Sequence, residues 1–207
     1  MQTIMITGCS SGFGLETARY FLEQGWKVIA TMRAPQEGVL PASDRLRLVR
    51  LDVTSAQSIA EAIAEAGEID VLVNNAGAMS KAPFLELSFD DWRHIFTVDV
   101  DGAFLCSQIA ARQMVKQGEG GRIVNITSVH EHTPLPDASA YTAAKHALGG
   151  LTKSMALELV KHKILVNAVA PGAIATPMND MDDSEVKEGS MPSIPLARPG
   201  HTKEIAS

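Results

Sequence analysis

The chain has 207 residues, 45% hydrophobic and 20% charged, which is the composition of an ordinary globular domain with a single core. Its formal net charge of -6 argues against a nucleic-acid partner, because phosphate binding requires clustered Lys and Arg. No apolar run reaches membrane-spanning length and the first residues are typical of a strand, so we expect a cytoplasmic protein with no membrane partner. Cys9 and Cys106 fall inside predicted elements, and we expect two free thiols.

Short apolar runs rich in β-branched residues alternate with helical patterns along the first half of the chain. The runs predict strands at residues 2–7, 27–32, 46–51 and 71–73. A glycine-rich loop after the first strand opens into a helix that Gly25 closes, and an Ala-rich helix is predicted over 55–65. Residues 35–45 are predicted to be a loop or one weak helical turn.

The second half continues the alternation with longer helices. One helix is predicted to run from Ser88 to Lys116, with Ser88 as N-cap and Asp91 at the capping-box position. The remaining elements are two strands and the long helix between them, at 122–127, 164–169 and 138–162.

Strands that are apolar throughout, instead of alternating, are typical of a parallel sheet covered on both faces by helices. Right-handed crossovers between such strands favour an α/β, Rossmann-like, doubly wound sheet. Residues 1–207 are therefore predicted to form one dinucleotide-binding catalytic domain. Residues 178–198 are rich in Asp, Ser, Pro and Met, and we predict a mobile lid over the site there.

Tyr141 and Lys145 form the most informative pair of the chain. Residues four apart on a helix share one face, so the Lys145 ammonium can lie beside the Tyr141 phenol and favour its ionised form. A free tyrosine titrates near pH ~10, which is too high for a good base at neutrality. A neighbouring cation favours the phenolate and so lowers this pKa. Ser128, thirteen positions earlier, can bind the same substrate oxygen. This chemistry suits carbonyl reduction or alcohol oxidation.

The glycine cluster Gly8, Gly12 and Gly14 follows the first strand. Such a cluster lets the backbone approach a pyrophosphate at the start of the next helix, although a tight turn would also require small residues. At the end of the second strand an acid would bind the ribose of NAD, but Met32 and Arg33 stand there. Arg33 and the Ser11 hydroxyl favour the 2′-phosphate of NADP, with NAD as the alternative.

Taken together, these motifs resemble the classical branch of the short-chain dehydrogenase/reductase family. They occur in family order over residues 1 to 176: the glycine cluster, Asn74-Asn75-Ala76-Gly77, Ser128, Tyr141-x-x-x-Lys145 and Pro171-Gly172. The N-terminal part looks like hydroxysteroid and retinol-type members, and the remainder like bacterial glucose dehydrogenases and 3-oxoacyl reductases. A natural mosaic or a chimera would account for this difference.

The resemblance implies a role for each matching residue. Tyr141 would transfer the proton, Lys145 would assist it and hold the nicotinamide ribose, and Ser128 would position the substrate oxygen. Further cofactor contacts are implied at Gly8, Ser11, Gly12, Phe13, Gly14, Asp52, Val53, Asn74, Ala76, Gly77, Pro171, Gly172, Ile174 and Thr176.

Two features depart from the family pattern. Asp99 stands where the family has Asn as the fourth catalytic residue, and a carboxylate only accepts hydrogen bonds whereas an amide also donates. After His201 to Ala206 the family continues through another helix and a final strand, and we expect these to be missing here. Subunit contacts commonly use those pieces, so the expected homo-oligomer depends on them.

The sequence thus predicts an NAD(P)-dependent oxidoreductase that interconverts a secondary alcohol and a ketone, or an aldehyde, of small-molecule size. The alternative is a dinucleotide-binding module without turnover. His130, Glu131 and His132 follow Ser128 and are candidates to touch substrate hydroxyls; we expect no metal there.

Overall fold

Six strands form one parallel sheet in the computed structural model, which describes residues 1–207 apart from the side chain of Glu185. The strands are β1 (Thr3–Ile6), β2 (Lys27–Met32), β3 (Leu46–Arg50), β4 (Val71–Asn74), β5 (Gly121–Ile126) and β6 (Ile164–Val169). Their order in the sheet is β3-β2-β1-β4-β5-β6. The direction of winding reverses between β1 and β4, and ligands of such sheets bind at this point beyond the carboxyl ends of the strands. The predicted doubly wound fold is confirmed.

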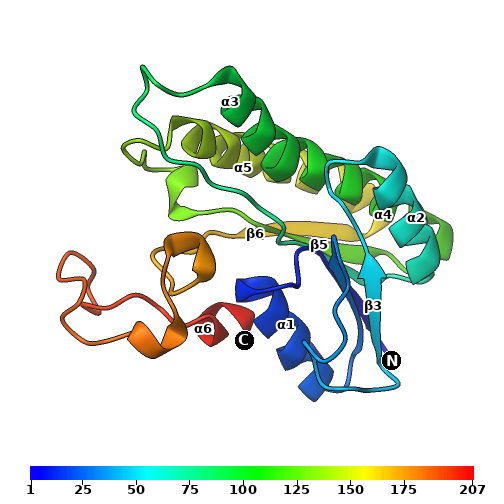
Figure 1. Cartoon of the computed structure of the whole chain (residues 1–207). Coiled ribbons are helices and arrows are strands. Elements are labelled where there is room, and N and C mark those ends of the chain that lie inside the picture. The colour runs from blue at the N-terminus through cyan, green and yellow to red at the C-terminus, as the bar shows by residue number, and fades with distance from the viewer.

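Helices cover both faces of the sheet (Figure 1). The helices are α1 (Gly12–Glu23), α2 (Ala56–Ala66), α3 (Phe89–Phe96), α4 (Gly102–Gln117), α5 (Ser139–Leu159) and α6 (Lys203–Ala206). In Figure 1, α2, α4 and α5 lie on one side of the sheet, whereas α1 and α6 lie on the other. In the described part of the chain, no helix combines the length and the apolar character needed to cross a membrane.

Two apolar clusters explain why the strands are apolar on both faces. Met5 and Ile29 pack with Ile59 of α2 and Met114 of α4 in one cluster. Ile4, the neighbour of Met5 in β1, packs in a second cluster on the α1 side. Because successive side chains of a strand point to opposite faces, a sheet buried on both sides needs apolar residues at every position.

The connection between β2 and β3 has no helix, as the sequence predicted. Residues 33–45 form turns and irregular backbone, and β2 still pairs with β3 in parallel. Leu40 is buried within this connection and joins the α1-side cluster. The loop therefore covers part of the face that a crossover helix would otherwise cover.

The predicted helix from Ser88 to Lys116 is helical along its whole length, but its middle is π-helical and not α-helical. α3 and α4 are separated by η1 (Thr97–Asp101), a π-helical turn. The N-cap is correct, since the Ser88 hydroxyl accepts the Asp91 N–H at 3.0 Å. A π turn inserts one extra residue and rotates the side chains that follow it. Asp99, within this turn, is 1% exposed and points into the protein.

The C-terminal segment is more regular than the predicted lid. It carries two single-turn helices, η4 (Pro177–Asn179) and η5 (Asp183–Glu185), before α6. A parallel bridge pairs Ile174 with Gly200, at opposite ends of the segment. The loop between them therefore returns to its starting point, and α6, which follows the loop, packs against α1.

Candidate active site

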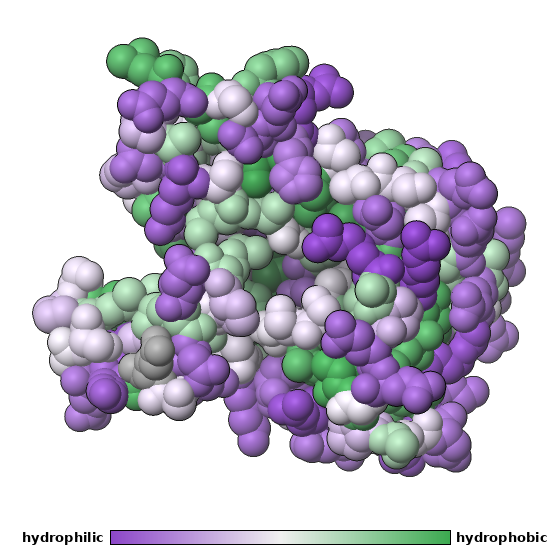
Figure 2. All heavy atoms as spheres, in the orientation of Figure 1, coloured by the Kyte–Doolittle hydropathy of each residue, from purple (hydrophilic) through white to green (hydrophobic). Residues whose placement is uncertain are grey.

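A cavity of about 730 Å³ lies at the carboxyl edge of the sheet, where β1 and β4 diverge. Figure 2 shows this face of the molecule hollowed between the part that carries α3 and the C-terminal segment. The volume is that of a typical ligand or cofactor cleft. The predicted residues that line the cavity are Gly8, Ser11, Gly12, Phe13, Arg33, Asp52, Val53, Ala76, Gly77, Tyr141, Lys145 and Thr176.

The glycine loop forms the floor of the cavity. Gly8 has φ +72, and a Cβ there would lie 2.9 Å from the Ala76 Cα. A Cβ at Gly14 would overlap the Gly8 carbonyl oxygen, so α1 packs against the loop only with glycine at this position. Ser11, the N-cap of α1, gives its helix no side-chain cap, and the first turn holds no acid. The open N–H groups of this helix end fit a pyrophosphate.

Asn75 fastens the ends of β1 and β4 together. Its side-chain amide donates to the carbonyl oxygens of Thr7 at 2.9 Å and Gly8 at 3.1 Å, and its backbone N–H donates to the Thr7 hydroxyl at 2.9 Å. The sequence analysis assigned no role to this side chain. Its position directly after a buried strand, beside the glycine loop of β1, was the available signal.

Two arginines lie near Asp52 of the cavity wall, and one of them, Arg33, lines the cavity itself. Arg33 follows β2, and Arg50 closes β3 opposite Met32 in the strand register. Asp52 accepts the Thr54 N–H at 3.0 Å and the Thr54 hydroxyl at 2.7 Å. These hydrogen bonds, and more weakly Arg33 and Arg50, hold the pKa of the Asp52 carboxyl below its usual range. Arg33 and Arg50 are both exposed, and a guanidinium group near Asp52 fits a phosphate on the adenosine ribose.

Tyr141 and Lys145 lie side by side on the cavity wall, as their spacing predicted. The Lys145 Nζ is 5.4 Å from the centre of the Tyr141 ring and donates to the Ile126 carbonyl oxygen at 3.2 Å. Both residues are buried, at 8% and 4% exposure. The Lys145 ammonium is thus a charged group that lies beside the Tyr141 phenol inside the protein.

Asp99 lies behind Lys145. Its Oδ2 is 3.0 Å from the Lys145 Nζ, and its Oδ1 accepts the Ala78 N–H at 2.7 Å. Burial is the largest influence on the Asp99 carboxyl and raises its pKa, while the Lys145 ammonium and the Ala78 N–H act in the opposite direction. The Asp99 carboxyl group does not line the cavity and meets the site through its ion pair with Lys145.

Ser128 sits at the start of η2 (Val129–Glu131), just beyond β5. Its hydroxyl oxygen accepts the His130 N–H at 3.1 Å, which leaves its own proton free to donate. The His130 ring lies 6.3 Å from the Tyr141 ring, edge to face. Glu131 turns away from this position, because its Oε1 is 2.9 Å from the exposed His132 and its Oε2 lies near Gly149 of α5.

Several predicted residues support the cavity from behind. Asn74 is 4% exposed, and its amide donates at 2.8 Å to both the Ser107 hydroxyl and the Asn125 side chain. It thus holds β4, β5 and α4 together. The other predicted residues outside the lining are Gly14, Asp99, Ser128, Pro171, Gly172 and Ile174.

One wall of the cavity was missed by the sequence analysis. Asp90, Arg93, His94 and Thr97 line it from α3 and the start of η1. Their spacing of three, four and seven residues places them on one helical face. A polar stripe at this spacing, on a helix that follows the end of β4, was the signal that could have identified them.

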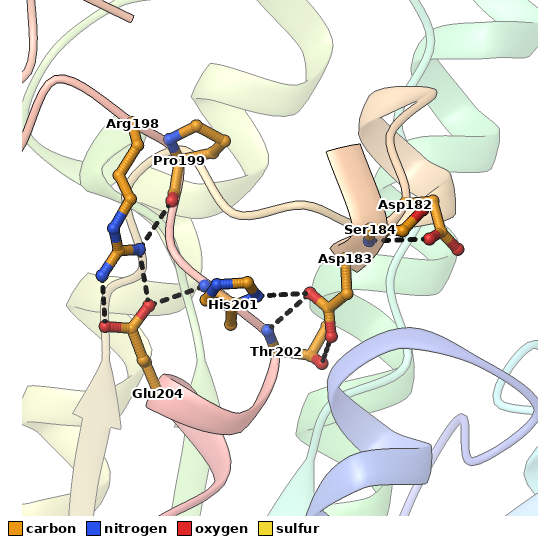
Figure 3. Close-up of polar contacts among 8 residues, drawn as sticks. All are labelled: Asp182, Asp183, Ser184, Arg198, Pro199, His201, Thr202 and Glu204. Carbon is orange, nitrogen blue, oxygen red and sulfur yellow. Dashed lines mark hydrogen bonds and ion pairs between the residues drawn. The ribbon is translucent and has the colours of Figure 1, made fainter. Parts of the chain in front are cut away.

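Two polar clusters hold the C-terminal segment together (Figure 3). The Glu204 carboxylate accepts both Arg198 guanidinium nitrogens, at 2.9 and 3.0 Å, and the His201 N–H at 2.7 Å. The Asp183 carboxylate accepts the Thr202 hydroxyl at 2.7 Å and faces His201 at 3.6 Å. Pro177 and Met178, which begin this segment, line the cavity.

Known proteins are similar to this chain in sequence and in fold. A profile described as short chain dehydrogenase matches residues 2–187. An uncharacterized oxidoreductase of Escherichia coli, YohF, is 64% identical over all of this chain and 86% of its own length. The crystal structure of an acetoin dehydrogenase from Enterobacter cloacae is 64% identical, has a TM-score of 0.86, and is matched over 100% of this chain and 86% of that one. A structure of ElxO with NADP bound is 31% identical with a TM-score of 0.90, over 99% and 88% of the two chains.

Proposed function

Since this chain belongs to the short-chain dehydrogenase/reductase family of oxidoreductases, we propose that it interconverts a secondary alcohol and a ketone with NADP, or alternatively NAD, as the hydride carrier. The observation that carries the proposal is the Tyr141–Lys145 pair on the wall of a cavity whose floor is a glycine loop. An acid/base group and a dinucleotide cradle thereby share one cleft at the carboxyl edge of the sheet.

In this mechanism Tyr141 holds the proton that passes to or from the substrate oxygen at its hydroxyl. Lys145 favours the phenolate that remains after the proton has left. Ser128 donates to the same substrate oxygen, which its free hydroxyl proton allows. Bound nicotinamide supplies or accepts the hydride. Pro177 and Met178 line the same cleft from the C-terminal segment.

The glycine loop and the arginines bind the cofactor in this proposal. The open N-terminus of α1 takes the pyrophosphate, and Arg33 takes a 2′-phosphate. The NADP-bound ElxO structure supports this assignment, because it shares the fold over 99% of the chain. Val53 and Asp52, at the end of β3, lie on the cavity wall where the adenine would sit.

We propose a small hydroxyketone as the substrate, with acetoin as the first candidate. The support is the 64% identity to the acetoin dehydrogenase of Enterobacter cloacae. Oxidation of acetoin would give its diketone, and reduction would give a diol. His130, beside the Tyr141 ring, is available to contact the second oxygen of such a substrate.

The test has a binding arm and a turnover arm. Binding of NADPH and NADH to the purified chain is followed by fluorescence, and turnover with acetoin, its diketone and a panel of carbonyl compounds is followed by nicotinamide absorbance. Tyr141→Phe should lower turnover by roughly 10²–10⁴-fold while cofactor affinity stays the same. Tight cofactor binding without consumption by any compound would favour the alternative, a binding module without turnover.

A homo-oligomer in the cytoplasm completes the proposal. Leu157 and Val160, at the end of α5, are 81% and 57% exposed, and Phe104 of α4 is 42% exposed. Exposed apolar side chains on neighbouring helices support a subunit contact. The two free cysteines suit a reducing compartment. Light scattering during size-exclusion chromatography measures the subunit number.

A further inference from the structure

We propose that the Asp99 carboxylate is a built-in counter-charge to Lys145, which moves the pH dependence of proton transfer at Tyr141 toward higher pH. The inference rests on the proposed function, in which Tyr141 exchanges the substrate proton. Asp99 acts through Lys145 in this proposal, so it is a positioning residue and does not touch the substrate.

The geometry of the pair leaves Asp99 Oδ2 with one partner. The Lys145 Nζ lies 3.0 Å from it, and no other polar atom of the described residues reaches it. The side chains of Lys145 and Asp99 are 5% and 0% exposed. Water therefore screens the pair little, and two opposite charges at this distance act on their surroundings as a nearly neutral unit.

The fold places the carboxylate there through the π turn η1. The turn directs Asp99 inward from the junction of α3 and α4, and the Ala78 N–H fixes Oδ1 at 2.7 Å. Gly77 lies against the pair, since a Cβ there would be 3.6 Å from Asp99 Oδ2 and 3.7 Å from Lys145 Nζ, and both Gly77 and Lys145 line the cavity. The pair thus borders the space where Tyr141 works.

Other charged groups around Tyr141 do not replace this counter-charge. His94, on α3, acts on Asp99 from the cavity side, and its neighbours Asp90 and Arg93 are exposed on the same helix. His130 of η2 meets the Tyr141 ring by its edge. Among the described residues, Asp99 alone forms an ion pair with Lys145.

The direction of the effect follows from charge. A lone Lys145 ammonium would stabilise the phenolate fully, whereas the Asp99 carboxylate cancels part of that attraction. Removing the carboxylate should make Tyr141 ionise at lower pH. An Asn at this position would keep an oxygen for the Ala78 N–H, and Lys145 would keep the Ile126 carbonyl oxygen.

The chain allows a direct measurement, because it has two tyrosines, Tyr20 and Tyr141. In a Tyr20→Phe background, the ultraviolet absorbance of tyrosinate reports Tyr141 alone in the cofactor-free protein. Asp99→Asn should lower the midpoint of this titration by about one pH unit. The pH profile of kcat/KM should move in the same direction by a similar amount.

Matched variants separate charge from packing. Asp101→Asn removes the same charge from an exposed position two residues away and should leave the midpoint where it is. Asp99→Glu keeps the charge and should stay close to the parent protein. Asp99→Ser is a second neutral variant, which also offers an acceptor to the Ala78 N–H. If Asp99→Asn fails to fold, Asp99→Ser should lower the midpoint of the Tyr141 titration in its place.

The two proposals fail separately. Turnover with an unchanged Tyr141 midpoint in folded Asp99→Asn would overturn the counter-charge and leave the function standing. A lowered midpoint in a chain that consumes no carbonyl compound would support the counter-charge and overturn the function. A midpoint that rises in Asp99→Asn would also overturn the counter-charge, because it would show that the carboxylate assists ionisation.

Discussion

At the scale of single residues, we expect Arg33 to determine the choice between the two nicotinamide cofactors. It directly follows β2, where an acidic residue would bind the two ribose hydroxyls of NAD. Arg33 is exposed at the cavity mouth, and Arg50 stands on the neighbouring strand. A guanidinium forms strong, charge-assisted hydrogen bonds with a phosphate, and its hydrogen bond with a neutral hydroxyl is weaker. The preference for NADP is therefore expected to reside in the arginine side chain.

Arg33→Ala should weaken NADPH binding by about ten- to a hundredfold, since hydrogen bonds to charged groups contribute about 1.5–3 kcal/mol. NADH affinity should change little. Titration of the variant with each cofactor measures both values. Arg19→Ala, which removes a guanidinium paired with Glu16 on α1, is the control. An equal loss for both cofactors in Arg33→Ala would contradict the assignment.

At the scale of elements, the Glu204 cluster ties the C-terminal segment into one unit. The side-chain hydrogen bonds from Arg198, followed by the His201 N–H, lower the pKa of the Glu204 carboxyl to about 2. A lowered pKa means that the carboxylate stabilises the folded segment above its ordinary pKa. That contribution is lost as the pH falls toward 2. Because the cluster is exposed, the effect is local to residues 198–206.

An amide resonance of His201 should report this titration. In the parent protein its chemical shift should change with a midpoint near pH 2, because its N–H donates to the Glu204 carboxylate. Glu204→Gln should abolish the transition and speed hydrogen exchange of the segment at neutral pH. Glu188→Gln, at an exposed position of the same segment, should leave it intact. A midpoint near the ordinary value for Glu would show that the cluster does not form.

The junction of α3 and α4 shows how one element serves the site. A regular helix through residues 97–101 would continue the face of α3, whereas the π turn brings Asp99 to Lys145. Such turns cost helical hydrogen bonding and are frequent at functional sites. The polar residues Asp90, Arg93 and His94 of α3, which line the cavity, and the buried Asp99, which pairs with Lys145, thus come from one continuous stretch of sequence.

At the scale of the whole molecule, the two thiols report opening of the fold. Cys9 lies in the glycine loop after β1 and Cys106 in α4, and both are buried. Burial raises the pKa of each thiol to about 12, so almost no thiolate exists at neutral pH. Both should react with a thiol reagent only when the protein opens.

Labelling should be slow in the native protein and fast for both thiols in denaturant. Saturating NADPH should slow it further, because a ligand that binds only the folded state stabilises that state. Cys9→Ser and Cys106→Ser separate the two rates by mass spectrometry. Rapid labelling of Cys9 alone in the native protein would show that the glycine loop opens independently of the core.

The local pattern of the sequence determined the six strands, most helices and the Tyr141–Lys145 pair. β2 and β6 have the predicted bounds, and the other strands differ by one or two residues. These features depend on interactions within a few residues, such as the apolar period, glycine conformations and the four-residue repeat of a helix. The family resemblance, which extends over most of the chain, could be recognised from the sequence because its motifs are also local patterns.

Contacts between distant segments decided the rest. The placement of Asn74 behind the cavity and the ion pair of Asp99 with Lys145 join residues remote in sequence. Asp99 reads as a polar residue in a helix, and only its burial against α5 turns it into a partner of Lys145. The energy of a buried charge depends on what surrounds it in space, and a linear sequence does not state which neighbours the fold will supply.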